Sequence, residues 1–309
     1  MNPLTGIYAA ASGLRNTLYD HRLLRARRLQ RPVVSVGNLT TGGSGKTPFV
    51  IALGELLKAR GVSFDVLSRG YRRKTRGVLA VEPEGTAADF GDEPLLISRR
   101  LGVPVIVGES RYEAGRLAEK TFETQLHVLD DGFQHRSLER DFDIVLMTGQ
   151  EFEDRLLPAG RLREPLSSLE RADAIVLPED LAISHRALSG KVVWRMRRNI
   201  NLEEAARSPV VFCGIARPRQ FFAQVRAAGI VPAHEITFGD HHSYQPRDIR
   251  RLQTAREQIR ADGFVTTEKD AVNLGPLADK LTPLTVARLS VSFEHADNIV
   301  DTILGRIGK

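Results

Sequence analysis

A glycine-rich segment that ends in lysine and threonine carries the clearest chemical signal in this sequence. A β-branched run, Val33–Val36, leads through a turn to Lys46 and Thr47, and an apolar helical pattern follows. Amides of such a turn point at phosphate oxygens, the lysine reaches the outer phosphates, and the threonine hydroxyl binds Mg²⁺. The segment therefore predicts a nucleoside triphosphate site. Its predicted contact residues are Thr40, Thr41, Gly42, Gly43, Ser44, Gly45, Lys46 and Thr47.

One position of this loop departs from the strict phosphate-binding loop (P-loop) pattern. That pattern places a glycine six residues before the lysine, where this chain has Thr40. Gly42, Gly43 and Gly45 supply backbone flexibility instead. A glycine-rich loop without a ligand is the alternative, and we consider it the weaker interpretation.

Two adjacent carboxylates, Asp130 and Asp131, end an apolar run that begins at Leu126. P-loop proteins usually hold their metal ion with the help of an acidic residue that ends a strand. Carboxyl ends of neighbouring parallel strands meet at one edge of a sheet, so both carboxylates should lie beside the loop. They predict, together with Thr47, a Mg²⁺ site, although acidic residues at strand ends are also common in turns.

Two further acidic segments are open to two interpretations each. Asp92 stands where a helix should begin, so it is either an N-cap or a base for a substrate hydroxyl, and the sequence alone favours the cap. Asp240, His241 and His242 follow a predicted strand. They form either an acid–base pair that reaches the active site from a second domain or a surface loop that caps the next helix.

Arg161 and Arg163 lie in a loop fixed by proline and glycine, between residues 157 and 165. Arginine suits bidentate contact with phosphate oxygens and with the charge of a transition state. Solvated surface arginines are the default alternative. The rigid setting favours a phosphate role.

Composition limits the class of protein. With 309 residues, of which 42% are hydrophobic, the chain can form one large or two modest domains. Its single cysteine, Cys213, excludes a disulfide framework and suits a reducing cytosol. Because Cys213 lies in an apolar run, we expect a buried strand thiol rather than a nucleophile.

The N-terminal tenth of the chain carries most of the formal net charge of +6, because six arginines and one acid fall within residues 1–31. The nearly neutral remainder argues against a nucleic-acid-binding surface. Ile7, Ala11, Leu14 and Leu18 recur at helical spacing, and the uncharged stretch before Arg15 is too short to span a membrane. This pattern predicts an amphipathic helix, either lying on an anionic bilayer or packed on its own domain.

The spacing of strands and helices predicts the fold that positions these residues. Apolar strands alternate with helices up to about residue 177, which is typical of a doubly wound, mainly parallel P-loop NTPase-type sheet. A second, smaller α/β unit follows and is expected to end in a helix at about 296–307. The predicted division is an N-terminal helix at 1–31, a nucleotide-binding domain at 32–185, and a C-terminal domain at 186–309 that contributes to the active site.

Seven segments together resemble the tetraacyldisaccharide 4'-kinase family of lipid A biosynthesis. They occur in the family's order, and the combination is specific although each segment alone is weak. The segments are Val36–Pro48, Ser68–Tyr71, Gly91–Pro94, Asp130–His135, Leu157–Pro165, Phe238–Tyr244 and Thr266–Asp270. The resemblance also accounts for the irregular loop, because the family's loop has the same Gly-Asn-Leu opening.

The resemblance implies an ATP- and Mg²⁺-dependent kinase that phosphorylates the 4'-hydroxyl of a tetraacylated disaccharide 1-phosphate at the cytosolic face of the bacterial inner membrane. By this match Asp92 accepts the hydroxyl proton with help from His241, with His242 as the alternative. Further implied roles are metal-side acids for Asp130 and Asp131, site lining for Gln134 and His135, and contact with the transferred phosphate for Arg163.

The chain departs from the commoner family pattern at its start, where many relatives have a longer and more hydrophobic segment. The resemblance nevertheless favours the membrane interpretation of the N-terminal helix, with attachment that is mainly electrostatic. Two rival functions are a membrane-recruited P-loop ATPase or GTPase switch and a nonenzymatic membrane-binding module. Acceptor-dependent use of ATP separates the kinase from both.

Overall fold

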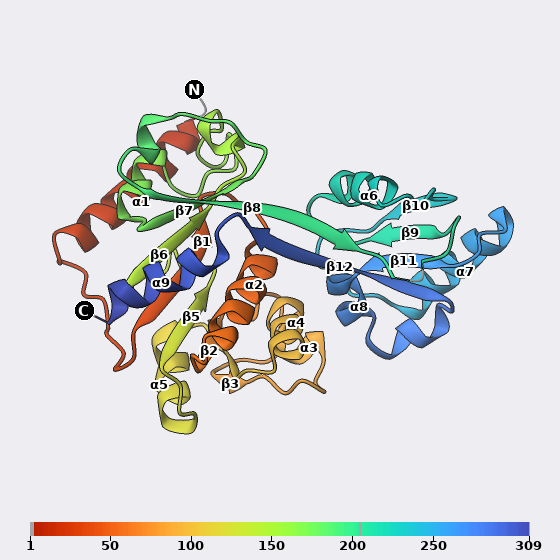
Figure 1. Ribbon diagram of the computed structural model, residues 1–309, viewed down its shortest axis with the longest axis horizontal. Helices are drawn as coiled ribbons and strands as arrows, with labels where there is room; N and C mark the ends of the chain where they lie inside the picture. The colour runs from red at the N-terminus through yellow and green to blue at the C-terminus, as the bar shows by residue number, and fades with distance from the viewer. Residues whose placement is uncertain (1–2, 204, 309) are drawn as a thin grey trace.

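The computed structural model describes residues 3–203 and 205–308 and consists of two lobes that share one sheet (Figure 1). In the described part of the chain the sheet has 12 strands in the order β10-β9-β11-β12-β8-β7-β6-β1-β5-β2-β4-β3. The strands are β1 (Val33–Asn38), β2 (Phe64–Ser68), β3 (Leu79–Ala80), β4 (Val105–Val107), β5 (Leu126–Asp130), β6 (Phe142–Leu146), β7 (Ala174–Pro178), β8 (Val192–Asn201), β9 (Val210–Cys213), β10 (His234–Thr237), β11 (Phe264–Thr267) and β12 (Leu284–Phe293).

Helices lie on both faces of this sheet. They are α1 (Pro3–Asp20), α2 (Lys46–Ala59), α3 (Ala87–Phe90), α4 (Asp92–Leu101), α5 (Arg111–Thr121), α6 (Pro218–Ala227), α7 (Pro246–Ile259), α8 (Glu268–Leu274) and α9 (Ala296–Ile307). Successive strand side chains point to opposite faces, so Val34 and Val66 pack in one core cluster with α2 and α4, while Val33 and Leu67 pack with α5 in another. Strands that are buried on both faces appear in the sequence as continuous apolar runs.

The first lobe has the predicted doubly wound sheet. Strand β1 lies between β5 and β6 and runs parallel to both, and β2, β4 and β7 continue the parallel order. Only the short edge strand β3 is antiparallel among the paired strands described in this lobe. The carboxyl ends of β1 and β5 therefore lie side by side, with Val36 opposite Asp130.

Two ten-residue strands connect the lobes. Strand β8 pairs with β7 at its beginning and with β12, antiparallel, at its end, so one ladder runs from the first lobe into the second (Figure 1). In the second lobe β9, β10, β11 and β12 are parallel. Cys213 is buried at the end of β9, and burial raises the pKa of its thiol to about 12, so it is an inert core residue as expected.

The C-terminal helix differs from the expectation that it completes the second unit. Helix α9 returns to the first lobe, where Ile299, Val300 and Ile303 are buried in the same core cluster as α2 residues (Figure 1). The apolar face of α9 requires a partner, and α2 provides one. The predicted division near residue 185 stays a prediction.

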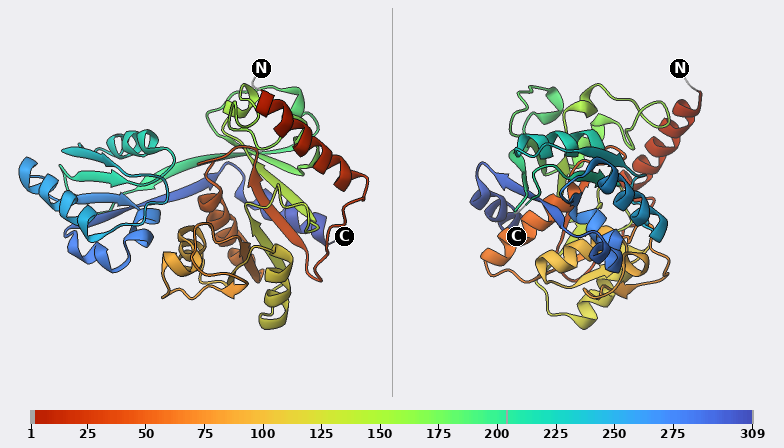
Figure 2. Two further views of the ribbon diagram at one scale, coloured as in Figure 1. Left: turned by 180° about the vertical axis from the view of Figure 1, so that it is seen from behind. Right: turned by 90° about the vertical axis from the view of Figure 1, so that its right-hand side faces the viewer.

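Helix α1 runs along the outer side of the first lobe and is shorter than the predicted 1–31 segment, because it ends at Asp20 (Figure 2). Met1 and Asn2 lie outside the described residues. None of the helices in the described ranges combines the length and the apolar character that a membrane span requires.

Candidate active site

The phosphate-binding loop connects the buried strand β1 to α2, as the sequence predicts. Gly42 and Gly45 adopt positive φ angles of 86° and 87°, which side chains rarely tolerate, so glycine is required at these positions. Thr40 is not among the positive-φ residues, and its buried hydroxyl accepts a hydrogen bond from Asn38 Nδ2 at 3.3 Å. A glycine is therefore unnecessary at position 40, which explains the departure from the strict pattern.

Lys46 and Arg163 meet at one carboxylate. Lys46 Nζ lies 3.5 Å from Asp131 Oδ1 and donates to Asn38 Oδ1 at 3.2 Å. The Arg163 guanidinium donates to Asp131 Oδ1 and Oδ2 at 2.9 and 3.1 Å and also to Asn38 Oδ1. Burial alone would raise the pKa of Asp131, but the charges of Lys46 and Arg163 hold it well below its ordinary value. Three separately predicted residues thus form one network.

The position of Arg163 follows from backbone pairing between two loops. Arg163 N donates to Leu39 O at 2.7 Å, and Thr41 N donates to Arg161 O at 2.9 Å. The loop that carries both arginines is thereby held against the phosphate-binding loop. Arg161 itself points elsewhere, because its side chain donates to Asp154 and Gln150.

Asp130 ends β5 beside the loop and is buried. Its Oδ2 accepts a hydrogen bond from Ser68 Oγ at 3.1 Å, whereas Oδ1 is a buried acceptor without a partner in the described part of the chain. Burial, reinforced by the charges of Glu93 and Asp131, raises the pKa of Asp130 to about 7. A buried carboxylate with an unpaired acceptor oxygen is suited to binding a cation, because a bound cation would offset the energetic cost of burying the unpaired negative charge.

The donor set around Asp130 suits Mg²⁺ in particular. No cluster of three or more histidine, cysteine, aspartate or glutamate side chains suited to a metal occurs among the described residues. Mg²⁺ does not need such a cluster, because it binds through one or two carboxylates while phosphates and waters supply the other ligands. Asp130, Asp131 and Thr47 are the residues that could hold it.

Asp92, which is buried, and His241, which is partly buried, form a pair across the two lobes. Asp92 is the first residue of α4, and Gly91 rather than Asp92 occupies the N-cap position. His241 Nδ1 lies 2.8 Å from Asp92 Oδ2, and Asp92 is only 4% exposed. Burial would raise the pKa of Asp92, but the hydrogen bond from His241 and the charge of Lys269 lower it overall. The carboxylate is therefore ionised and orients the imidazole.

The two neighbouring histidines have different partners. His242 Nε2 lies 3.0 Å from Asp248 Oδ2, and Asp248 belongs to the capping box at the start of α7. The ring of His242 also stacks on Phe238. The structure thus brings His241 to Asp92 and places His242 beside the helix cap. An acid–base role for the Asp92–His241 pair stays a prediction.

Two site residues, Lys269 and Asn273, were not identified from the sequence. Asn273 Nδ2 donates to Asp92 Oδ2 at 2.9 Å, and Lys269 Nζ lies 3.2 Å from His241 Nε2 and 2.8 Å from Glu93 Oε1. Both belong to α8, where a spacing of four residues places them on one helix face. That spacing was the available signal, but only the tertiary structure shows that α8 contacts α4.

Gln134 contacts the phosphate-binding loop, whereas the described contacts of His135 lie elsewhere. Gln134 Nε2 donates to Asn38 O at 2.9 Å, so Gln134 lies at the base of the phosphate-binding loop. His135 Nε2 instead lies 3.1 Å from Ser137 Oγ. Burial, with the charges of Arg111 and Arg140, lowers the pKa of His135 to about 4, so its imidazole is neutral near pH 7.

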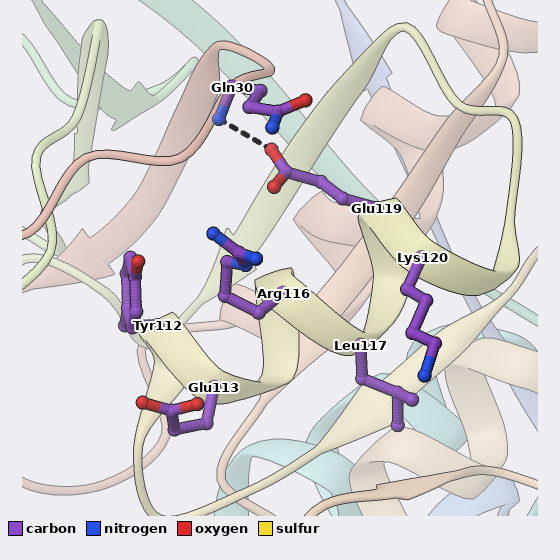
Figure 3. A pocket seen from close by; sticks show the side chains of 7 residues that line it. All are labelled: Gln30, Tyr112, Glu113, Arg116, Leu117, Glu119 and Lys120. Carbon is purple, nitrogen blue, oxygen red and sulfur yellow. Dashed lines mark hydrogen bonds between the residues drawn. The ribbon is translucent and has the colours of Figure 1, made fainter.

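A separate pocket of about 490 Å³ lies along α5 (Figure 3). Gln30 and α5 residues line it, and Gln30 N donates to Glu119 Oε1 at 2.6 Å across its edge. None of the sequence-predicted site residues, all of which the structure describes, lines this pocket. We do not assign it to the candidate active site.

A phosphate-binding loop, a strand-end acid pair and an aspartate–histidine pair between two lobes, on a doubly wound sheet, define a P-loop phosphotransferase. The family model described as tetraacyldisaccharide-1-P 4'-kinase matches residues 1–307. The chain belongs to this family, which confirms the resemblance seen in the sequence.

Curated relatives and a solved structure agree with this assignment. The chain is 47% identical to a tetraacyldisaccharide 4'-kinase from Koribacter versatilis, with 98% of each chain covered. It is 38% identical to one from Geobacter metallireducens, with 96% of this chain and 95% of the relative covered. A crystal structure of LpxK from Aquifex aeolicus in complex with ATP is similar with a TM-score of 0.82 and 34% identity, covering 99% of this chain and 97% of that chain. The predicted fold class is thereby confirmed.

Proposed function

We propose that this protein transfers the γ-phosphoryl group of ATP to the 4'-hydroxyl of tetraacyldisaccharide 1-phosphate in lipid A biosynthesis. The observation that carries the proposal is the contact between Asp92 and His241, because a P-loop switch that hydrolyses nucleotide has no need of an acid–base pair contributed by a second lobe. Membership of the kinase family supports the choice of acceptor.

In this proposal the first lobe holds the nucleotide. Amides of the loop between Thr40 and Thr47 bind the phosphates, and Lys46 and Arg163 neutralise the charge that develops on the transferred group. Thr47, Asp130 and Asp131 would hold Mg²⁺, which would neutralise charge on the outer phosphates. Asp131 keeps Lys46 and Arg163 together before the nucleotide arrives.

The aspartate–histidine pair removes the proton of the acceptor hydroxyl. Both Asp92 oxygens already accept hydrogen bonds, from His241, Asn273 and the Glu93 amide. We therefore assign the proton to His241 Nε2 and an orienting role to Asp92, which reverses the order of the two suggested by the resemblance. Lys269 can leave Nε2 because it retains Glu93 as its counter-ion.

Membrane attachment through α1 is a further part of the proposal. The polar side of α1 is the docked side, because Tyr8 donates to Arg163 O, Asn16 donates to Glu164, and Arg136 donates to Asn16 O. The predicted apolar stripe faces outward, with Ile7 and Leu14 67% and 62% exposed.

An outward apolar stripe fits a helix lying on a bilayer, and it disfavours the alternative in which the stripe packs on the protein. The arginines contribute less to membrane attachment than their number suggests, because Arg27 pairs with Glu113 and Arg28 pairs with Glu139 and Asp141. We place the protein at the cytoplasmic face of the bacterial inner membrane, held by this stripe together with the remaining arginines of residues 1–31 rather than mainly by charge, as the sequence suggested.

The test is ATP consumption measured with and without tetraacyldisaccharide 1-phosphate in mixed micelles. We expect ADP to form only when acceptor is present, together with an equal amount of 4'-phosphorylated product. ADP formation at the same rate without acceptor would instead identify a nucleotide-hydrolysing switch.

A further inference from the structure

The backbone around His241 contacts the first lobe, as its side chain does. Arg72 Nη1 donates to Asp240 O and to His241 O, the latter at 3.1 Å. Arg72 lies between β2 and β3 in the first lobe, 169 residues from His241 in the sequence. His241 is therefore joined to the first lobe at two points, through its imidazole by Asp92 and through its backbone by Arg72.

The peptide group between Asp240 and His241 is bonded at both of its polar atoms. His241 N donates to Gly214 O at 3.0 Å, within the second lobe. The carbonyl oxygen of the same peptide group accepts from Arg72, across the lobes. Because the peptide group is planar, it cannot rotate without losing one of these hydrogen bonds. Arg72 thus restricts the backbone that carries the imidazole.

His241 adopts a backbone conformation that needs such support. Its φ angle is 54°, in the left-handed region that residues other than glycine rarely adopt. Conformations of this kind persist where surrounding contacts hold them, and they cluster at active sites. Without Arg72 we expect the backbone of His241 to relax, which would turn the imidazole away from Asp92.

Arg72 is carried by the same corner of the first lobe that holds Asp92. A Cβ atom at Gly91, the residue before Asp92, would lie only 3.1 Å from Tyr71 O, so the loop with Arg72 packs directly against the start of α4. The Lys74 amide donates to a carbonyl group of α3 and secures the loop on its other side. Asp92 and Arg72 therefore have one common support, from which they contact the side chain and the backbone of the same histidine.

We propose that Arg72 is a positioning residue, which sets the orientation of the His241 imidazole through the carbonyl oxygens on either side of the His241 backbone. The inference rests on the proposed kinase function and adds a residue that acts through His241 rather than by contact with either reactant. It assigns a role to a loop outside the phosphate-binding segment and outside the aspartate–histidine pair.

Steady-state kinetics of the full chain with Mg²⁺·ATP and tetraacyldisaccharide 1-phosphate test this inference. Arg72→Gly is the informative variant, because glycine tolerates the φ angle of 62° at this exposed position and only the side chain is lost. It should lower kcat about tenfold and leave the KM values for both substrates unchanged, since a misplaced catalytic group slows the chemical step. Arg76→Gly removes the same side chain from another exposed position of the loop and should match wild type.

A double-mutant cycle with His241→Ala separates positioning from an independent role. Because Arg72 acts through His241, Arg72→Gly should change kcat by less than about twofold when His241 is already alanine. Nitrogen-15 NMR of the histidine side chains gives a second readout that does not depend on turnover. The His241 imidazole signal, identified by its loss in His241→Ala, should shift in Arg72→Gly and stay in place in Arg76→Gly.

The outcomes separate the inference from the proposed function. If Arg72→Gly has the kcat and the imidazole signal of Arg76→Gly, the inference is wrong while the kinase assignment stands. It is also wrong if Arg72→Gly raises the KM for acceptor at unchanged kcat, or if it lowers kcat equally with and without His241. If wild-type protein forms no acceptor-dependent product, the proposed function itself fails, and the NMR comparison alone decides whether Arg72 orients His241.

Discussion

The nucleotide side and the acceptor side of this site are built in different ways. Lys46, Thr47 and the loop before them form one continuous segment, and its Gly42 and Gly45 set the required backbone conformation locally. Asp92 and His241 are 149 residues apart and belong to different lobes. Their approach depends on packing between α4 and α8, where Arg100 pairs with Glu268 and Lys269 with Glu93.

The nucleotide side and the acceptor side should therefore respond differently to substitutions. A local motif keeps its geometry as long as its own backbone does, whereas a pair that spans two lobes depends on every contact that sets their relative position. Variants on the nucleotide side should therefore affect nucleotide binding and turnover together. Variants on the acceptor side should affect turnover alone.

The largest effect is expected from Lys46→Ala. Lys46 is the cation closest to the expected position of the outer phosphates, so its loss should lower kcat/KM by about 10³-fold and weaken ATP binding as well. Steady-state kinetics and calorimetry would measure the two effects. Lys58→Ala is the matched control, because Lys58 lies at the other end of α2 and donates only to Leu101 O among its described hydrogen bonds. Equal kinetics for the two variants would contradict the assignment.

His241→Ala should lower kcat by about 10²-fold and leave the Kd for ATP unchanged. The reason is that His241 contacts Asp92 and Lys269 and lies on the acceptor side. His242→Ala provides the control, because His242 contacts the α7 capping box instead. A larger loss of kcat in His242→Ala than in His241→Ala would show that the structure assigns the wrong histidine.

The same contrast explains what the sequence could and could not predict. The doubly wound sheet and the phosphate-binding loop follow from local patterns, and Asp130 beside the loop follows from strand order. The roles of Lys269 and Asn273 do not follow from local patterns or strand order, because nothing in residues 266–273 indicates contact with α4. The choice between His241 and His242 also required the structure, since both side chains follow the same strand. The sequence assigns helix α9 to the wrong lobe, because its amphipathic pattern predicts a buried face but does not identify the element that covers it.

The stability of the interlobe pair should depend on pH. Folding lowers the pKa of Asp92 below its ordinary value of 3.8, so the pair stabilises the fold above that value. The contribution is lost as the pH falls through the lowered folded pKa. Asp92→Asn should therefore reduce the free energy of unfolding by about 1–2 kcal/mol at pH 7 and by progressively less in acid.

Urea unfolding of wild type and Asp92→Asn, from pH 7 down to the acid limit of the fold, measures this difference. Asp301→Asn is the control, because the Asp301–Arg60 pair is largely exposed and should contribute little at any pH. A difference between wild type and Asp92→Asn that stays constant with pH would mean that the Asp92 carboxylate is not held in its charged form by folding.

The smallest expected effect concerns α1 and the membrane. Ile7→Ser removes apolar area from the outward stripe, so binding to phosphatidylglycerol vesicles should weaken about three- to tenfold. The KM for acceptor presented in vesicles should rise, while the KM for ATP should not, since Ile7 is 67% exposed and its change leaves the docked face of α1 intact. Ala10→Ser, at another exposed position of α1, removes little apolar area and should bind vesicles like wild type. If both KM values changed together, α1 would act on the nucleotide side through Arg163, and the separation between the two sides of the site would not hold.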